Sequence, residues 1–202
     1  MDEKRTQEHL HDADRVLNDI REHLEFNQEM GDVYELKALQ LLLEVTKSMH
    51  VQRDIRALMT LVLDSALSFA EADRAFLLMT QPDGSLRFKM GRTYDGHYLT
   101  EENCVISTSV TDAALEAREP IILADAQHDN KFSARQSIID LNLRTIMTAP
   151  LRCDENVLGL IYVDSKRPMA RYSKHHLNVL SSLADQSAVA LHNARKFETH
   201  TG

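Results

Sequence analysis

Apolar residues near the start of the chain recur at the spacing of a helix. They fall every three or four positions, with charged residues between them, at Leu10, Ala13, Leu17, Ile20 and Leu24. This pattern predicts an amphipathic helix with a heptad seam about two heptads long. Gly31 is placed to end it, because glycine readily takes the left-handed conformation of a helix C-cap. Asp32 and Glu35 have the spacing of a capping box and predict a second helix running to about Met49.

Two more helices are expected farther along the chain. Asp54 can cap a third helix, whose apolar face is formed by Ile55, Leu58, Val62, Ala66 and Phe69. Ser173 can cap a closing helix that runs to about Glu198. The seam of this closing helix again has spacings of three and four, at Leu177, Leu180, Ala184, Ser187, Leu191 and Ala194.

The region between these helices has the pattern of strands. Residues 75–79 and 86–90, joined by a turn that contains Pro82 and Gly84, predict a β-hairpin. Strands joined by tight turns predict an antiparallel sheet with helices on its faces, an α+β fold. The other expected elements are a short strand at 104–108, a helix at 110–118, a strand at 121–123, a helix around 133–141, and strands at 144–151 and 157–164 hinged at 154–156.

Charge and composition narrow the choice of partners. Residues 1–35 hold eleven acidic and four basic residues, while the whole chain has a net charge of −8. An acidic segment repels phosphate backbones, so we expect no direct nucleic-acid binding. No apolar run approaches the roughly 18–20 residues that a membrane span needs, so no membrane insertion is expected. Two cysteines, Cys104 and Cys153, cannot build a disulfide framework and favour a reducing, cytoplasmic setting.

Several of these segments resemble the GAF domain family, whose members sense small molecules in signalling proteins. The hairpin from Thr145 to Asp164 and the closing helix after Tyr172-Ser173 carry the most specific likeness. The segment 119–125 followed by Asn130-Lys131-Phe132 is similar to another family motif, although Glu119 replaces its common glycine. The helix that begins at Asp54 and leads into Ala72-Asp73-Arg74-Ala75 looks like the family's first core helix and strand.

The resemblance implies an architecture and a role. It implies a GAF-like antiparallel sheet of about six strands, with terminal helices on one face and a ligand pocket on the other. Residues 1–31 would then form an acidic signalling or dimerisation helix, and residues 32–198 the GAF domain with its closing helix. It also implies a homodimer through the terminal helices, whose seams we expect to be open, and an output domain outside this chain. Such output domains in the family are kinases, cyclases, phosphatases and transcription activators.

Strand parity and the resemblance together name the candidate ligand site. Thr145, Met147 and Ala149 share one face of their strand, and Ile146, Thr148 and Pro150 share the other. A tyrosine in an apolar strand brings a hydroxyl that needs a partner if it is buried. We expect a small-molecule site, with the ligand unidentified and no metal or catalytic residue, formed by Phe76, Asp125, Asn130, Phe132, Met147 and Tyr162.

Two other readings stay open beside the sensor. Free-methionine-sulfoxide reductases are GAF enzymes with clustered cysteines, and Cys104 and Cys153 give that reading weak support. A GAF fold with a filled core could also serve only for dimerisation. Attachment of a bilin is not indicated, because the family's attachment cysteine is usually followed by histidine, whereas Val105 and Asp154 follow the cysteines here.

Overall fold

A computed structural model describes residues 43, 46–47, 54–123, 125–127, 142–166 and 174–200, with side chains to residue 194. The chain divides into two units, Met1–Gln40 and Leu41–Gly202. All of the described residues belong to the second unit. The expected helices at 10–24 and 133–141, the caps Gly31 and Ser173, and the proposed boundary after residue 31 therefore lie outside them.

Helix α2, Ile55–Ala70, begins where the sequence predicts. The Asp54 carboxylate accepts a hydrogen bond of 2.8 Å from the backbone N–H of Arg56, which satisfies one of the unpaired donors of the first turn. The helix ends at Glu71, which takes the left-handed conformation. One face of α2 is buried against the sheet and against the closing helix α5, Lys174–His200.

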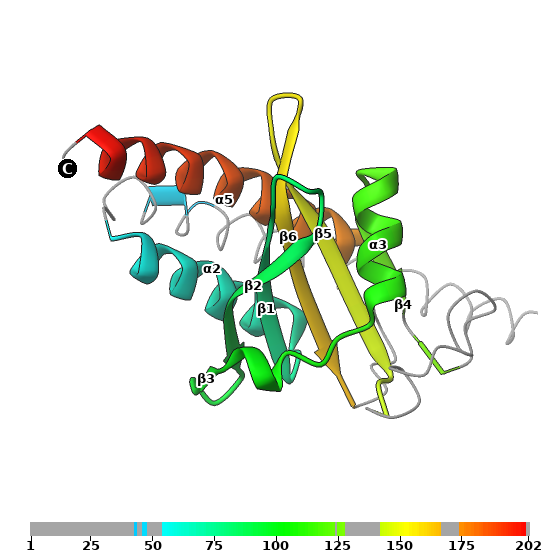
Figure 1. Ribbon diagram of the computed structural model, residues 1–202. Coiled ribbons are helices and arrows are strands. Elements are labelled where there is room, and N and C mark those ends of the chain that lie inside the picture. The colour runs from blue at the N-terminus through cyan, green and yellow to red at the C-terminus, as the bar shows by residue number, and fades with distance from the viewer. Residues whose placement is uncertain are drawn as a thin grey trace, which may run out of the picture. The chain divides into compact units, whose positions relative to one another are not determined.

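Six antiparallel strands form one sheet in the order β3-β2-β1-β6-β5-β4, which confirms the predicted fold class (Figure 1). The two predicted hairpins form its centre, and each strand extends a residue or more beyond the apolar run that predicted it. The strands are β1 Arg74–Thr80, β2 Leu86–Thr93, β3 Tyr98–Leu99, β4 Ile121–Leu123, β5 Thr145–Cys153 and β6 Asn156–Ser165.

Each face of the sheet carries its own apolar cluster. On the helix face, side chains of α2 and α5 pack on β1, β5 and β6, and this cluster includes Leu63, Leu77, Ile161 and Ala184. The second face carries Phe76 and Tyr162 and packs against helix α3, Thr108–Ala117, and the irregular segment before it. We call these the helix face and the opposite face.

The prediction of a strand at 104–108 is wrong. Residues 104–107 take no regular structure, and Thr108 already belongs to α3. The edge of β2 is instead paired with the two-residue strand β3, which is followed by a 3-10 helix, Glu101–Asn103. A strand of two residues is too short to show the alternation by which strands are found in a sequence.

The seam of the closing helix is not open, contrary to expectation. Five of its six residues are buried inside this chain, and the four apolar ones among them join the cluster that contains α2 and β5. The expectation failed because the same 3,4 spacing marks any buried helix stripe, whether a second chain or the helix's own domain covers it. The exposed stripe of α5 consists of His175, Asn178, Ser182, Gln186, Val189 and Asn193.

Candidate functional site

The candidate site lies on the opposite face of the sheet. Strand pairing places Gly91, Phe76, Tyr162 and Thr148 side by side across β2, β1, β6 and β5. Phe76 and Tyr162 are fully buried, with ring centroids 6.2 Å apart and tilted planes. An added Cβ at Gly91 would lie 2.9 Å from Phe76 Cδ1, so the Phe76 ring occupies the space above this glycine. The aromatic pair is therefore fixed by its neighbours on both sides.

A bidentate ion pair lies on β1 and β6 two residues from the aromatic pair, between Arg74 and Asp164. Arg74 Nε and Nη2 donate to the two carboxylate oxygens of Asp164 over 2.9 and 2.6 Å, and Nη2 also donates to the carbonyl of Val105 over 3.2 Å. The Arg74 guanidinium lies 5.1 Å from the centroid of the Phe76 ring. Burial raises the pKa of the Asp164 carboxyl, and the hydrogen bond and charge of Arg74 oppose that rise. The pair thus places charge beside a buried aromatic ring.

The buried Tyr162 hydroxyl has the partner that its position requires. It accepts a hydrogen bond of 3.4 Å from the backbone N–H of Ser107, the residue that precedes α3. Burial raises the pKa of Tyr162 well above its usual value, with a further contribution from the charge of Asp164. The phenol is therefore neutral at physiological pH and keeps a proton that it can donate.

The two cysteines are separated by the sheet. Cys104 packs against the cluster of the opposite face, and Cys153 packs against the cluster of the helix face. Both are free thiols. Burial raises the pKa of Cys104 to about 11, and this outweighs the lowering effect of Arg74. Because the thiolate is the reactive form, Cys104 is a poor nucleophile in this setting.

The structure brings together only some of the predicted site residues. Phe76 and Tyr162 lie together in the cluster of the opposite face. Met147 is misplaced in the prediction, because it pairs with Val163 and lies in the helix-face cluster. Parity sorted β5 correctly into two sets, but it cannot say which set faces the helices. Ile146 belongs to the cluster that contains Tyr162.

Asp125 comes directly before Ala126, which packs in the cluster of the aromatic pair. The Asp125 side chain is half exposed and forms an ion pair with Arg144 at 3.6 Å, just before β5 begins. Asn130 and Phe132 lie outside the described residues. The proposed loop cover of the site therefore stays a prediction.

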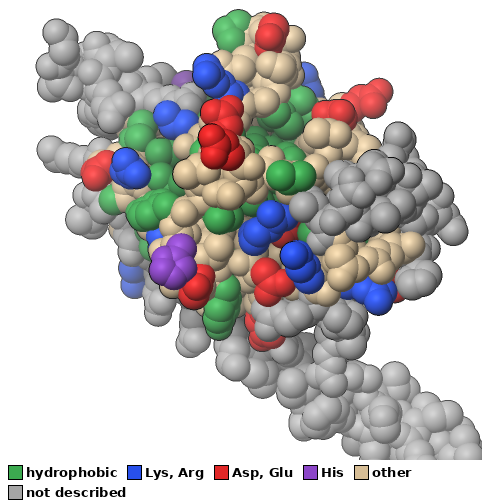
Figure 2. All heavy atoms as spheres, turned by 60° about the horizontal axis from the view of Figure 1, so that its bottom comes forward, with side chains coloured by type: hydrophobic (Ala, Val, Ile, Leu, Met, Phe, Trp, Pro, Cys, Tyr) green, Lys and Arg blue, Asp and Glu red, His purple; other side chains and the backbone are tan. Residues whose placement is uncertain are grey.

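Arg74 and Asp164 are the residues that the sequence reasoning missed. The signal was present, because each lies two residues from a predicted site residue on its own strand and hence on the same face. Figure 2 shows basic and acidic side chains interspersed on the face that it draws, where no stripe of one sign forms.

The described part of the chain offers neither a cluster of metal ligands nor a membrane-spanning helix. No group of three or more His, Cys, Asp or Glu residues there could hold a metal ion. None of its helices is both long and apolar enough to cross a membrane.

Comparison with known families decides the identity of the fold. The GAF domain profile matches residues 54–191, which is most of the chain. The chain belongs to the GAF domain family. Its fold is also that of the GAF domain from a Coxiella burnetii phosphoenolpyruvate-protein phosphotransferase, with a TM-score of 0.64 and 16% identity over 81% of this chain and 98% of the other.

Curated relatives are much longer proteins of signal transduction. A dual 3′,5′-cyclic-AMP and -GMP phosphodiesterase 11 of Drosophila melanogaster is 23% identical over 83% of this GAF chain, which spans 13% of that protein. A hybrid signal transduction histidine kinase G of Dictyostelium discoideum is 26% identical over 39% of this chain and 2% of its own length. GAF domains similar to this one thus occur in signalling proteins with phosphodiesterase or kinase activity.

Proposed function

We propose that this chain is a non-catalytic regulatory sensor domain that binds a small molecule on the opposite face of its sheet. Family membership and the signalling context of the relatives support the regulatory role. The observation that supports a ligand site is a cluster of polar side chains within that apolar face. It consists of the Arg74–Asp164 pair and the neutral Tyr162 hydroxyl beside the Phe76 ring.

The chemistry of this group suggests how a ligand is held. An aromatic surface with a few convergent polar groups is typical of small-molecule sites, where apolar contact gives affinity and hydrogen bonds give orientation. Tyr162 offers a proton to an acceptor, and Arg74 offers a cation already held in place by Asp164. Residues 128–132, with Asn130 and Phe132, are proposed to cover the ligand, and Asp125 to lie at the margin of the site.

The bound state would reach an output domain through the terminal helices. We propose that two copies of the chain pair through these helices in the cytoplasm, and that a kinase, cyclase, phosphatase or transcription activator responds. The exposed stripe of α5, rather than its buried seam, is the surface available for such pairing among the described residues.

A second candidate function is supported by a different observation. Phe76 and Tyr162 have no exposed surface, as in an ordinary filled core. This favours a GAF fold that serves dimerisation without any ligand. The sulfoxide-reductase reading is disfavoured by the separation of Cys104 and Cys153 and by the protonated state of the Cys104 thiol.

Native mass spectrometry of the purified chain, followed by analysis of released small molecules, tests the proposal. We expect a stoichiometric small molecule whose occupancy falls at least tenfold in Tyr162→Phe or Arg74→Met. Met147→Leu, a change on the helix face of the same sheet, is the matched control and should keep full occupancy. An empty protein, also after incubation with a metabolite extract, would favour the dimerisation module. Turnover of methionine sulfoxide with a reactive thiol would favour the enzyme.

A further inference from the structure

One segment of the chain touches both faces of the sheet. Residues 98–107, which we call the strap, leave the edge of the sheet at β3 and end at the N-terminus of α3. Tyr98 and Leu99 are neighbours in β3 and so point to opposite faces. Leu99 packs in the cluster that contains Phe76, while Tyr98 reaches α2 on the helix face.

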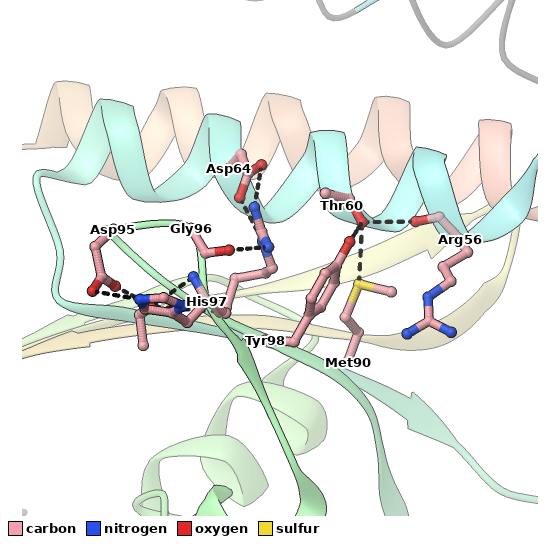
Figure 3. A network of polar contacts seen from close by, with 10 residues as sticks. Arg56, Thr60, Asp64, Met90, Asp95, Gly96, His97 and Tyr98 are labelled. Carbon is pink, nitrogen blue, oxygen red and sulfur yellow. Dashed lines mark hydrogen bonds and ion pairs between the residues drawn. The ribbon is translucent and has the colours of Figure 1, made fainter.

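The α2 end of the strap is held by the Tyr98 side chain (Figure 3). Thr60 Oγ1 lies 3.0 Å from the Tyr98 hydroxyl and 3.0 Å from the carbonyl of Arg56. A hydroxyl has one proton, so when Thr60 donates to that carbonyl, Tyr98 donates to Thr60. The guanidinium groups of Arg92 and Arg56 lie 4.4 and 5.5 Å from the centroid of the Tyr98 ring.

Arg92 of β2 also binds α2, so the hairpin of β2 and β3 contacts this helix at a second place. Its Nε and Nη2 donate to the two carboxylate oxygens of Asp64 on α2, both over 2.8 Å, and Nη1 donates to the carbonyl of Gly96. Figure 3 shows Asp64 and Thr60 on the side of α2 that faces this hairpin. The hairpin and α2 are therefore joined through polar contacts at an edge of the sheet, where Tyr98 is still half exposed.

The other end of the strap is held by the candidate ligand site. Ser107 donates its backbone N–H to the Tyr162 hydroxyl, and the Val105 carbonyl accepts from Arg74. Between the two ends, Thr100 and Asn103 form a reciprocal capping box around a turn of 3-10 helix. Beyond this turn, Cys104 and Ile106 pack against the same cluster as Leu99, so the two ends of the strap are linked by the turn and by shared packing.

We propose that the strap couples the candidate ligand site to helix α2. A ligand that accepts the Tyr162 proton and also donates to the Tyr162 oxygen in place of the Ser107 N–H frees the strap at that end, and the strap then withdraws Tyr98 from Thr60. Since α2 packs against α5, this release changes the support of the closing helix. The identity of the trigger rests on the proposed function, whereas the coupling is a property of the ligand-free chain.

Hydrogen exchange of the whole chain, read by mass spectrometry without any added ligand, tests the coupling. Tyr162→Phe removes the acceptor of Ser107, and we expect exchange at the far end, residues 96–100, to become about threefold faster. Tyr98→Phe removes the contact with Thr60, and exchange at residues 104–108 should rise by a similar factor, because coupling is reciprocal. Tyr94→Phe, at an exposed tyrosine of the same hairpin, should change neither end.

A second variant separates coupling from local damage. Thr60→Val removes the hydroxyl that Tyr98 meets and leaves both tyrosines in place, so it should reproduce the effect of Tyr98→Phe at residues 104–108. The proposal is overturned if every variant alters only the end that it touches. That outcome would leave the sensor proposal standing, whereas an empty site in native mass spectrometry would remove the trigger and leave the coupling.

Discussion

Gly91 in β2 sets how closely Phe76 packs against β3. Its backbone does not have a positive φ, so alanine is compatible with the strand, but an added Cβ would lie 2.9 Å from the Phe76 ring and 3.0 Å from Leu99 Cβ. Both neighbours are held in the cluster of the opposite face. The position therefore depends on space rather than on backbone freedom.

We expect Gly91→Ala to lower the free energy of unfolding by about 1–3 kcal/mol, the usual effect of overpacking a core. Urea unfolding measures the loss. Phe76→Leu in the Gly91→Ala background should recover part of it, because leucine is smaller than the ring that the new methyl group meets. Equal, purely additive losses would contradict the packing argument.

Arg74 of β1 and Asp164 of β6 form a buried ion pair. The Asp164 side chain is 1% exposed and that of Arg74 is 20% exposed. Removing one partner of such a pair leaves the other charge without compensation, whereas replacing both removes the problem. The two substitutions should therefore be strongly non-additive.

We expect Arg74→Met to lower the free energy of unfolding by about 3–5 kcal/mol, and Arg74→Met with Asp164→Leu to lower it by much less. The pKa of Asp164 is already raised by burial and rises further without Arg74. The folded state of Arg74→Met then binds this proton more tightly than the unfolded state, so its deficit relative to the parent chain should shrink as pH falls from 7 toward 5. Urea midpoints at both pH values test this, and a constant deficit would contradict it.

At the scale of elements, α2 and α5 meet near the end of α2. His176 of α5 lies against Phe69 of α2, with ring centroids 5.3 Å apart. Burial lowers the pKa of His176 from its usual 6.5, as does the neighbouring His175, while Glu71 opposes the shift. Protonation of His176 thus works against the packing of the two helices.

Because the folded-state pKa lies below the unfolded one, His176 is neutral in both states above pH 7 and affects stability only below that. The unfolded chain takes up the proton first as pH falls, so stability is lost from about pH 7 downward. We expect the urea midpoint to fall less between pH 7.5 and 5.5 in His176→Leu than in the parent chain. His97→Gln, at an exposed histidine in the turn between β2 and β3, is the control and should keep the parent's dependence.

At the scale of the whole molecule, the exposed stripe of α5 determines how two copies of the chain could associate. The apolar seam is used inside the domain, and the exposed stripe is mostly polar apart from Val189, which is 49% exposed. A polar stripe alone supports only a modest interface. The dimer that we propose therefore depends on residues beyond this stripe, including the acidic segment with its Leu10–Leu24 seam.

We expect light scattering of the whole chain at tens of micromolar to give twice the chain mass. Leu17→Asp with Ile20→Asp, inside that seam, should shift the protein to the mass of one chain, because charge at a heptad seam opposes association. Ser182→Asp on the α5 stripe is the comparison and should have a smaller effect. A single-chain mass for the parent protein would remove the dimer.

The sequence determined most of the elements. Asp54 marks the start of α2 because its side chain completes the first turn locally. The strands at 74–80, 145–153 and 156–165 were found because runs of apolar residues next to tight turns leave few alternatives. Family likeness added the number of strands, which periodicity alone does not give.

Only the tertiary structure decided what each element faces. Parity separated Met147 from Ile146, but the side on which α2 and α5 pack is set by contacts between distant segments. Parity also places Arg74 and Asp164 on the face of Phe76 and Tyr162. That the two residues, 90 positions apart, meet as an ion pair follows only from the pairing of their strands. Helical periodicity in α5 marked a buried stripe and left open what covers it. Local chemistry specifies where elements begin and end, and long-range packing specifies which of their residues come into contact.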